Sequence, residues 1–181
     1  IDPFVAQSTL AIFCDVLEPS TGQPYERDPR SIAKKAEAFM LSQGIGDAVY
    51  FGPEAEFFIF DDVKFSTDMY KVGFQVDSSE LPSHSDTSYE MGNLAHRPRV
   101  KGGYFPVPPV DHYADLRDEM VQALIASDFT VERSHHEVGT GGQAEINYRF
   151  DTMVHAADDI QKFKYIVKNT AEQWGKSTTI M

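Results

Sequence analysis

The stretch that most constrains the fold covers residues 51–60, where two carboxylates interrupt an otherwise apolar segment. In an extended chain successive side chains point to opposite faces, so Glu54 and Glu56 share one face. The other face is lined by Ala55, Phe57 and Ile59. Ionised carboxylates are rarely buried unless they are paired or bind a metal. The stretch therefore predicts a strand that helps to hold a divalent cation, or a strand with two solvated glutamates.

Periodicity and turn residues predict further strands and helices on both sides of this stretch. A helix is expected to begin with Asp28 as N-cap and Pro29 at its first position, and to end before Gly44. Asp111 is expected to cap a second helix. The other predicted elements are strands at 8–17, 70–76, 129–138 and 143–150, and a helix at 155–174.

The strand at 70–76 is expected to pair as a hairpin with residues 51–60 and to turn Val72, Phe74 and Val76 inward. Hairpins combined with helices indicate an α+β fold with a mixed, largely antiparallel sheet. Residues 77–103 show little periodicity and predict a long loop, which in a compact domain is often functional. Lys101 and Tyr104, at the end of that loop, could contact a ligand or could be a solvated and a packed side chain.

Charge and cysteine content exclude several classes of protein. Lys and Arg number 16 and Asp and Glu number 28, a net charge of −12. This balance argues against non-specific binding to nucleic acid or anionic membranes. The single cysteine, Cys14, excludes an internal disulfide and a multi-cysteine zinc site, and its apolar neighbours predict that it is buried. The chain begins at Ile1 and ends in a strand-like run, so we expect a fragment of a longer protein.

Four glutamates on three predicted strands could converge on one space: Glu54, Glu56, Glu137 and Glu145. Carboxylates gathered in this way raise one another's pKa unless a cation is present. Oxygen ligands suit Mg²⁺ or Mn²⁺ better than zinc. His135 and His136 would point to opposite faces of a regular strand, so one is expected to be structural, and a ligand role for either stays open. The sequence contains no P-loop or Gly-x-Gly-x-x-Gly motif.

In several stretches, spread in order over nearly the whole chain, the sequence strongly resembles the prokaryotic type I glutamine synthetase family. The longest matches are Phe-Gly-Pro-Glu-Ala-Glu-Phe-Phe, Lys-Gly-Gly-Tyr-Phe-Pro-Val-Pro-Pro-Val-Asp and His-His-Glu-Val followed by Gln-Ala-Glu. The matching segments are 1–4, 15–19, 27–34, 51–58, 96–98, 101–111, 135–138 and 143–145.

The resemblance implies an enzyme that joins glutamate and ammonia at the expense of ATP, through γ-glutamyl phosphate, with two divalent metals, Mg²⁺ or Mn²⁺. Tyr104 would lie near the ammonium and glutamate region, and Glu132 and Phe150 would belong to the nucleotide site. The residues expected to bind one of the two metals are Glu56, Glu137 and Glu145. Glu54 is expected to bind the other metal. In a regular strand Glu132 and Glu137 face opposite ways, so both can serve only with a bulge or a strand end between them.

The resemblance also implies an organisation for the parent protein. Residues 1–24 would be the tail of a β-grasp-like N-terminal domain and the linkage into the catalytic domain. Residues 25–181 would form the first part of that domain, a curved sheet flanked by helices. A cytoplasmic dodecamer of two hexameric rings is expected, and the isolated chain is expected to be inactive. The alternatives are a related glutamate–amine ligase (γ-glutamylpolyamine-type) and a catalytically dead structural homologue.

Overall fold

The computed structural model describes residues 1–81 and 95–181, which form two compact units. One unit comprises residues 1–53 and 149–163, and the other comprises residues 54–148 and 164–181. The long loop predicted at 77–103 lies partly outside the described residues, and its described parts carry no helix or strand beyond Asp77. Among the described residues, no helix is long and apolar enough to cross a membrane.

The first unit contains α1 (Pro29–Ser42), the short pair β1 (Tyr50–Phe51) and β7 (Asp151–Thr152), and the beginning of α3 (Met153–Gln173). The predicted start of α1 is confirmed, because the Asp28 side chain accepts hydrogen bonds from the backbone N–H groups of Arg30 and Ser31. Its predicted end is also confirmed by Gly44, whose φ of 64° is the left-handed conformation that favours glycine after a helix.

The strand predicted at 8–17 is wrong, and so is the burial of Cys14. This segment forms only an isolated bridge between Leu17 and Pro24, and Cys14 is exposed. The side chains of Leu10 and Ile12 are also exposed. A strand needs a hydrogen-bonded neighbour as well as apolar residues, and the described residues provide none along most of this run.

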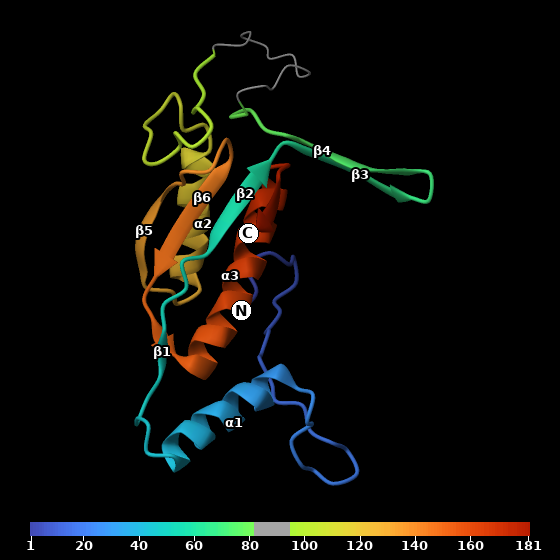
Figure 1. Ribbon diagram of the computed structural model, residues 1–181, viewed down its shortest axis with the longest axis vertical. Helices are drawn as coiled ribbons and strands as arrows, with labels where there is room; N and C mark the ends of the chain where they lie inside the picture. Colours follow the sequence, from blue (N-terminus) through green and yellow to red (C-terminus); the bar gives the residue numbers. More distant parts are fainter. Residues whose placement is uncertain (82–94) are drawn as a thin grey trace. The chain divides into compact units, whose positions relative to one another are not determined.

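The second unit is built on an antiparallel four-stranded sheet with the order β5-β6-β2-β8 (Figure 1). Its strands are β5 (Val131–His136), β6 (Gln143–Tyr148), β2 (Glu56–Phe60) and β8 (Ser177–Ile180). The expected α+β class with a largely antiparallel sheet is thereby confirmed. The strand predicted at 51–60 is shorter than expected, since residues 52–55 lie outside β1 and β2.

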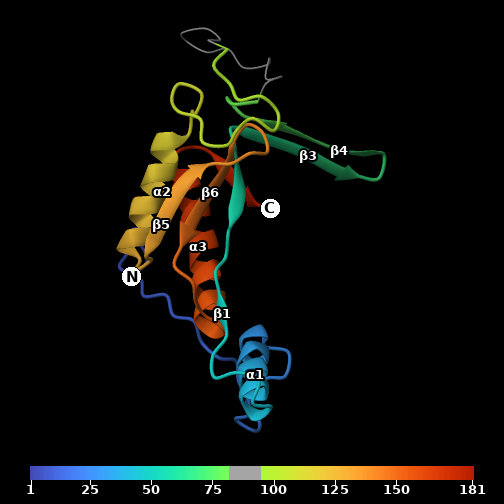
Figure 2. The same cartoon turned by 60° about the vertical axis from the view of Figure 1, so that its left-hand side comes forward.

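Two helical segments cover one face of this sheet: α2 (Ala114–Ala126) and the part of α3 after residue 163 (Figures 1 and 2). The buried apolar side chains between them and the sheet make the core of the unit. From the strands they are Phe57, Ile59, Ala144 and Ile146, and from the helices Leu116, Met120, Leu124, Ile166, Val167 and Ala171. Burying a side chain of this size contributes about 1.5–3 kcal/mol, so this face holds the strands in place.

The second helix begins later than predicted, and Asp111 does not cap it. Tyr113 occupies the N-cap position of α2 without a side-chain hydrogen bond. Asp111 instead forms a buried ion pair with Arg117, with a distance of 2.6 Å between Oδ2 and Nη2. The Arg117 guanidinium group in α2 therefore binds the Asp111 carboxylate, which was expected to accept hydrogen bonds from the backbone N–H groups at the start of the helix.

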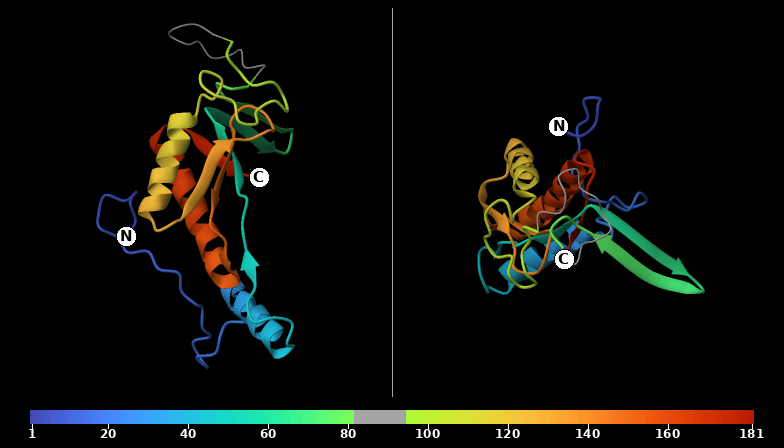
Figure 3. Two further views of the ribbon diagram at one scale, coloured as in Figure 1. Left: turned by 90° about the vertical axis from the view of Figure 1, so that its left-hand side faces the viewer. Right: turned by 90° about the horizontal axis from the view of Figure 1, so that it is seen from above.

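The predicted hairpin exists, but with a different partner strand. Residues 71–77 form β4 (Lys71–Asp77), which pairs with β3 (Asp62–Asp68) and not with residues 51–60 (Figure 3). The predicted inward side chains Val72 and Phe74 are 82% and 80% exposed. The error arises because alternation fixes which residues share a face, whereas only the packing decides whether that face is covered.

Candidate metal centre

The other face of the four-stranded sheet carries a row of polar side chains. Glu56 on β2 is paired in register with Glu145 on β6, and Glu145 is paired with His135 on β5. Residues directly opposite one another in neighbouring strands project to the same face. Three strands therefore direct two carboxylates and one imidazole to one side, away from the apolar core.

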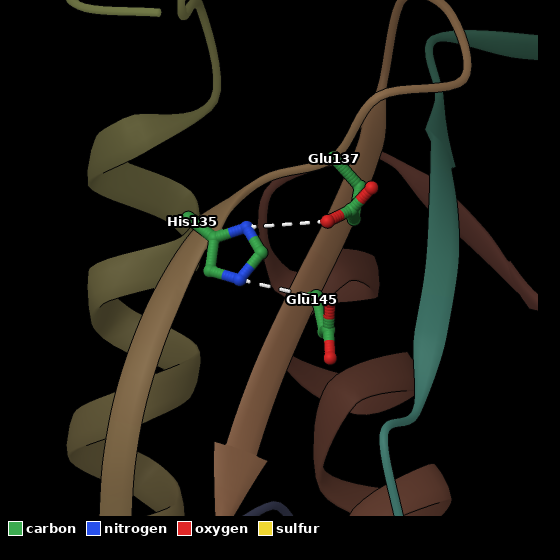
Figure 4. A group of neighbouring side chains, drawn as sticks. All are labelled: His135, Glu137 and Glu145. Atoms are coloured by element: carbon green, nitrogen blue, oxygen red, sulfur yellow. Dashed lines mark ion pairs between the residues drawn. The ribbon is translucent and has the colours of Figure 1, made fainter. Parts of the chain in front are cut away.

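His135, Glu137 and Glu145 form a compact buried group in which one potential ligand atom from each lies within 4.8 Å of the others. Figure 4 shows the imidazole beside the two carboxylates, with one ring nitrogen directed toward each. His135 Nδ1 lies 3.7 Å from Glu137 Oε1, and Nε2 lies 3.6 Å from Glu145 Oε2. All three side chains are buried. A cation of small radius could contact an atom of each residue.

Hydrogen bonds from neighbouring groups fix the orientation of each carboxylate. Gln143 donates from Nε2 to Glu56 Oε2 at 2.6 Å, and Asn147 donates from Nδ2 to Glu145 Oε1 at 2.7 Å. The backbone N–H of Val138 donates to Glu137 Oε2 at 2.6 Å. Each contact leaves the second oxygen of the carboxylate available, which is the arrangement expected of ligands held by an outer shell.

The electrostatics of this face favour a cation. Burial raises the pKa of Glu56, and the nearby charges of Glu137, Glu145 and Glu54 raise it further, against a smaller opposite effect of His135. A divalent ion would remove this mutual repulsion, and carboxylate oxygens are the ligands that Mg²⁺ and Mn²⁺ prefer. The residues present therefore fit the metal that the sequence predicts, with an imidazole as a further donor.

The sequence leaves a ligand role for His135 open, whereas it predicts the two glutamates of this group as ligands. Its Nδ1 lies 3.1 Å from the His136 carbonyl oxygen, which can only accept a hydrogen bond. A neutral ring that donates from Nδ1 leaves a lone pair on Nε2, the atom directed at Glu145. The sequence feature that indicates its place beside the glutamates is its position two residues before Glu137, because alternate residues of a strand share a face.

Tyr104 lies beside this group. Its ring packs edge-on against His135 with 5.5 Å between centroids, and Phe105 stacks on His135 at 4.5 Å. The Tyr104 side chain is 61% exposed. Tyr104 is therefore a largely exposed aromatic residue beside His135.

The remaining predicted site residues lie outside the compact group. Glu54 is exposed and precedes β2, although its charge still raises the pKa of Glu56. Glu132 is exposed at a register shift of β5, between Val131 and Arg133, and β5 ends before Glu137. From the sequence, a bulge or a strand end is expected between Glu132 and Glu137, and β5 has a register shift at Glu132 and ends at His136. Phe150 belongs to the other unit, where it packs edge-on against Tyr50.

The second histidine has the structural role expected for one of the pair. His136 is 1% exposed and is hydrogen-bonded through both ring nitrogens. Burial alone would lower its pKa, but the Glu80 carboxylate and the carbonyls of Glu137 and Gly103 raise the pKa overall. Sequence reasoning did not find Glu80, because nothing in its neighbourhood of Ser and Pro indicates burial.

Known proteins resemble this chain over its whole length. Residues 26–181 match the family model described as glutamine synthetase, catalytic domain. The chain is 58% identical over 181 residues to the glutamine synthetase of Rhizobium meliloti and 54% identical to that of Escherichia coli K12. All of the chain is covered in both alignments, but only 38% and 39% of the relatives. The chain thus spans less than half the length of the curated relatives it matches.

The fold is also that of a solved relative. A cryo-EM structure of Plasmodium falciparum glutamine synthetase superposes with a TM-score of 0.83 at 34% identity, covering 93% of this chain and 33% of that one. Sequence and fold are therefore similar to the same group of enzymes, and the buried carboxylates lie within the matched residues. The chain belongs to the glutamine synthetase family.

Proposed function

We propose that the protein containing this chain ligates ammonia to L-glutamate, giving L-glutamine, with ATP as the energy source and γ-glutamyl phosphate as the intermediate, in nitrogen assimilation. The observation that carries the proposal is the buried group of His135, Glu137 and Glu145 beside Glu56, within a chain of this family. A row of buried carboxylates on an otherwise well-packed sheet destabilises the fold unless the carboxylates bind a cation.

The metal ligands are assigned from this face of the sheet. Glu56, Glu137 and Glu145 would hold one Mg²⁺ or Mn²⁺, with His135 as a neighbouring donor, and Glu54 would serve a second ion. Bound divalent cations neutralise phosphate oxygens and polarise the group under attack. The protein's own part is to orient the carboxylates, which the hydrogen bonds from Gln143 and Asn147 do.

Substrate-binding roles are proposed for three further residues. Tyr104, exposed at the edge of the cluster, would contact the ammonium and glutamate region. Glu132, at the bulge of β5, would bind the nucleotide, and Phe150 would pack near the adenine. The register shift at Glu132 supports its assignment, since residues five positions apart in a regular strand face opposite ways and a bulge allows Glu132 and Glu137 to serve one site.

The organisation of the whole protein is proposed from the family. Residues 1–24 would close a β-grasp-like N-terminal domain and residues 25–181 would begin the catalytic domain, and the family match from residue 26 supports that division. The assembly would be a cytoplasmic dodecamer of two hexameric rings. Measuring the subunit and assembly masses of the native protein tests this proposal, and a monomeric native protein would contradict it.

A related glutamate–amine ligase and a catalytically dead homologue are not favoured. The curated relatives with 52–58% identity over the chain are glutamine synthetases. All four predicted metal glutamates are present, which a protein without metal chemistry would not need.

The test is an assay of glutamine formation with the full-length protein that carries this chain, alongside Glu137→Gln and a matched control, Glu172→Gln. Glu172 is exposed on α3. Loss of a metal ligand is expected to lower kcat/KM by about 100-fold or more, while the control keeps its activity. The isolated 181-residue chain is expected to form no glutamine. Full activity of Glu137→Gln would contradict the assignment of the site.

A further inference from the structure

One buried carboxylate outside the metal group, that of Glu80, is hydrogen-bonded to three segments of the second unit. Glu80 follows β4, has no exposed surface and is not among the residues that the family resemblance assigns. A fully buried glutamate is rare unless its oxygens are saturated with donors. The identity of those donors therefore indicates what the residue does.

The two oxygens of Glu80 accept three hydrogen bonds from three different segments. Oε2 accepts from His136 Nε2 at 2.7 Å and from the backbone N–H of Gly142 at 2.6 Å. Oε1 accepts from the backbone N–H of His112 at 2.6 Å. The carboxylate thus joins the end of β5, the start of β6 and the segment before α2.

Through His136 the contact reaches Glu137 and the loop of Tyr104. His136 Nδ1 lies 2.8 Å from the Glu137 carbonyl oxygen and 2.7 Å from that of Gly103. The packing here is tight, because a Cβ on Gly103 would lie 2.4 Å from the Glu137 carbonyl oxygen. A shift of the imidazole ring would therefore move the backbone of both segments.

Through Gly142 the contact reaches the other side of the cluster. Gly142 has a φ of 81°, and its carbonyl oxygen accepts from the Ile59 N–H at 2.8 Å. The next residue, Gln143, donates to Glu56 through its side chain, and its carbonyl oxygen accepts from the Glu137 N–H at 2.9 Å. Glu80 therefore holds both ends of the turn that joins Glu137 to the strand bearing Glu145.

We propose that Glu80 is a positioning residue of the metal centre, setting the placement of Glu137 through His136 and that of the Glu56–Gln143 pair through Gly142. The inference rests on the proposed function and goes beyond it, since the hydrogen bonds of the Glu80 carboxylate to the described residues go to His112, His136 and Gly142 and not to the proposed metal ligands. Glu80 acts by fixing the positions of the metal ligands, and a metal site loses affinity when the groups that hold its ligands in place are removed.

Glu80→Gln removes this role with almost no change in volume. In one orientation the amide NH₂ group faces the N–H of His112, and in the other it faces the N–H of Gly142. Either orientation sets a donor against a donor, so at least one hydrogen bond is lost and the turn must move. Glu80→Asp keeps the charge but is one methylene shorter, so it cannot reach all three donors.

The experiment measures binding of Mn²⁺ alone to the full-length protein by calorimetry, the electron paramagnetic resonance spectrum of the bound ion, and kcat and KM for glutamate. The variants are Glu80→Gln and Glu80→Asp. The matched control for lost stability is Asp111→Asn, which breaks the buried pair with Arg117 in the same unit. A urea midpoint reports the stability of each protein.

We expect both Glu80 variants to bind Mn²⁺ about 10–100-fold more weakly than wild type, with an altered spectrum and a lower kcat. Asp111→Asn should lose stability and keep wild-type affinity. Wild-type Mn²⁺ affinity in folded Glu80→Gln, or in Glu80→Asp if the first variant does not fold, overturns the inference alone. An equal loss of affinity in Asp111→Asn also overturns it. A wild-type protein that binds no Mn²⁺ overturns the proposed function and this inference with it.

Discussion

At the scale of single residues, the carboxylates of the polar face differ in burial and in partners, and these differences predict their chemistry. Glu137 and Glu145 are 7% exposed, whereas Glu54 is exposed to solvent. Glu56 lies between these extremes, and its pKa is raised by burial and by the other carboxylates. A proton therefore competes with a metal ion for Glu56 at a higher pH than for an ordinary glutamate.

This competition predicts how the affinity for Mn²⁺ depends on pH. Because the folded, metal-free Glu56 has a raised pKa, affinity should fall as the pH is lowered through a range above ~4.3, the ordinary value for glutamate. Glu56→Gln should bind more weakly at all pH values and show a shallower dependence. Calorimetric titrations of Mn²⁺ at several pH values check this, and equal slopes for the two proteins would contradict it.

At the scale of elements, β2 shows how alternation separates a core face from a chemical face. Phe57 and Ile59 have no exposed surface, while Glu56 on the opposite face is paired with Glu145. In the hairpin of β3 and β4, by contrast, Phe65 is 76% exposed. Two phenylalanines on strands that follow one another along the chain, but belong to different sheets, thus have opposite environments.

The two phenylalanines give a matched pair of substitutions. Phe57→Ala should lower the free energy of unfolding by about 3–5 kcal/mol, because it leaves a cavity beneath the sheet. Phe65→Ala should change it by less than about 0.5 kcal/mol, since the side chain is largely solvated. Urea denaturation of the two variants measures both values, and a similar loss for each would show that the hairpin is covered in solution.

At the scale of the whole molecule, hydrogen bonds between segments that are far apart in the sequence stabilise the second unit. Asp61, after β2, accepts a hydrogen bond from Tyr113 Oη at 2.9 Å and pairs with Lys176 across 2.5 Å. These residues are 52 and 115 positions away from Asp61 along the chain. Burial raises the pKa of Asp61, but hydrogen bonds from Lys176, Tyr113 and Ser79 outweigh it and lower the pKa overall.

The lowered pKa predicts acid sensitivity. The pKa of Asp61 is lower in the folded than in the unfolded state, so its contribution to the stability of the fold is complete above pH ~3.9, the ordinary aspartate pKa. That contribution is lost as the pH falls through the folded-state pKa. Asp61→Asn should therefore be less stable than wild type near neutral pH, with the difference shrinking in acid. Thermal unfolding of both proteins from neutral to acidic pH checks this, and a constant difference would contradict it.

Several features of the chain follow from local rules that the sequence alone contains. The N-cap at Asp28, the glycine after α1 and the alternation of residues 143–148 depend on neighbours within a few positions, so they are predictable. A bulge or a strand end between Glu132 and Glu137 is also expected, because residues five positions apart in a regular strand face opposite ways, and β5 has a register shift at Glu132 and ends at His136. Likewise, the glutamates of the polar face follow from period-two spacing and from the rarity of buried carboxylates.

Only the tertiary structure decided which of these patterns are covered and which side chains meet. The apolar runs at 8–17 and in the hairpin read as core, yet they are exposed, because burial depends on partners that local sequence does not contain. His135 joins the carboxylates through strand register, and Glu80 reaches His136 across 56 residues. Contacts over such separations depend on how the strands pair and pack, which is why residue spacing predicted that glutamates gather on one face but not which groups hold them in place.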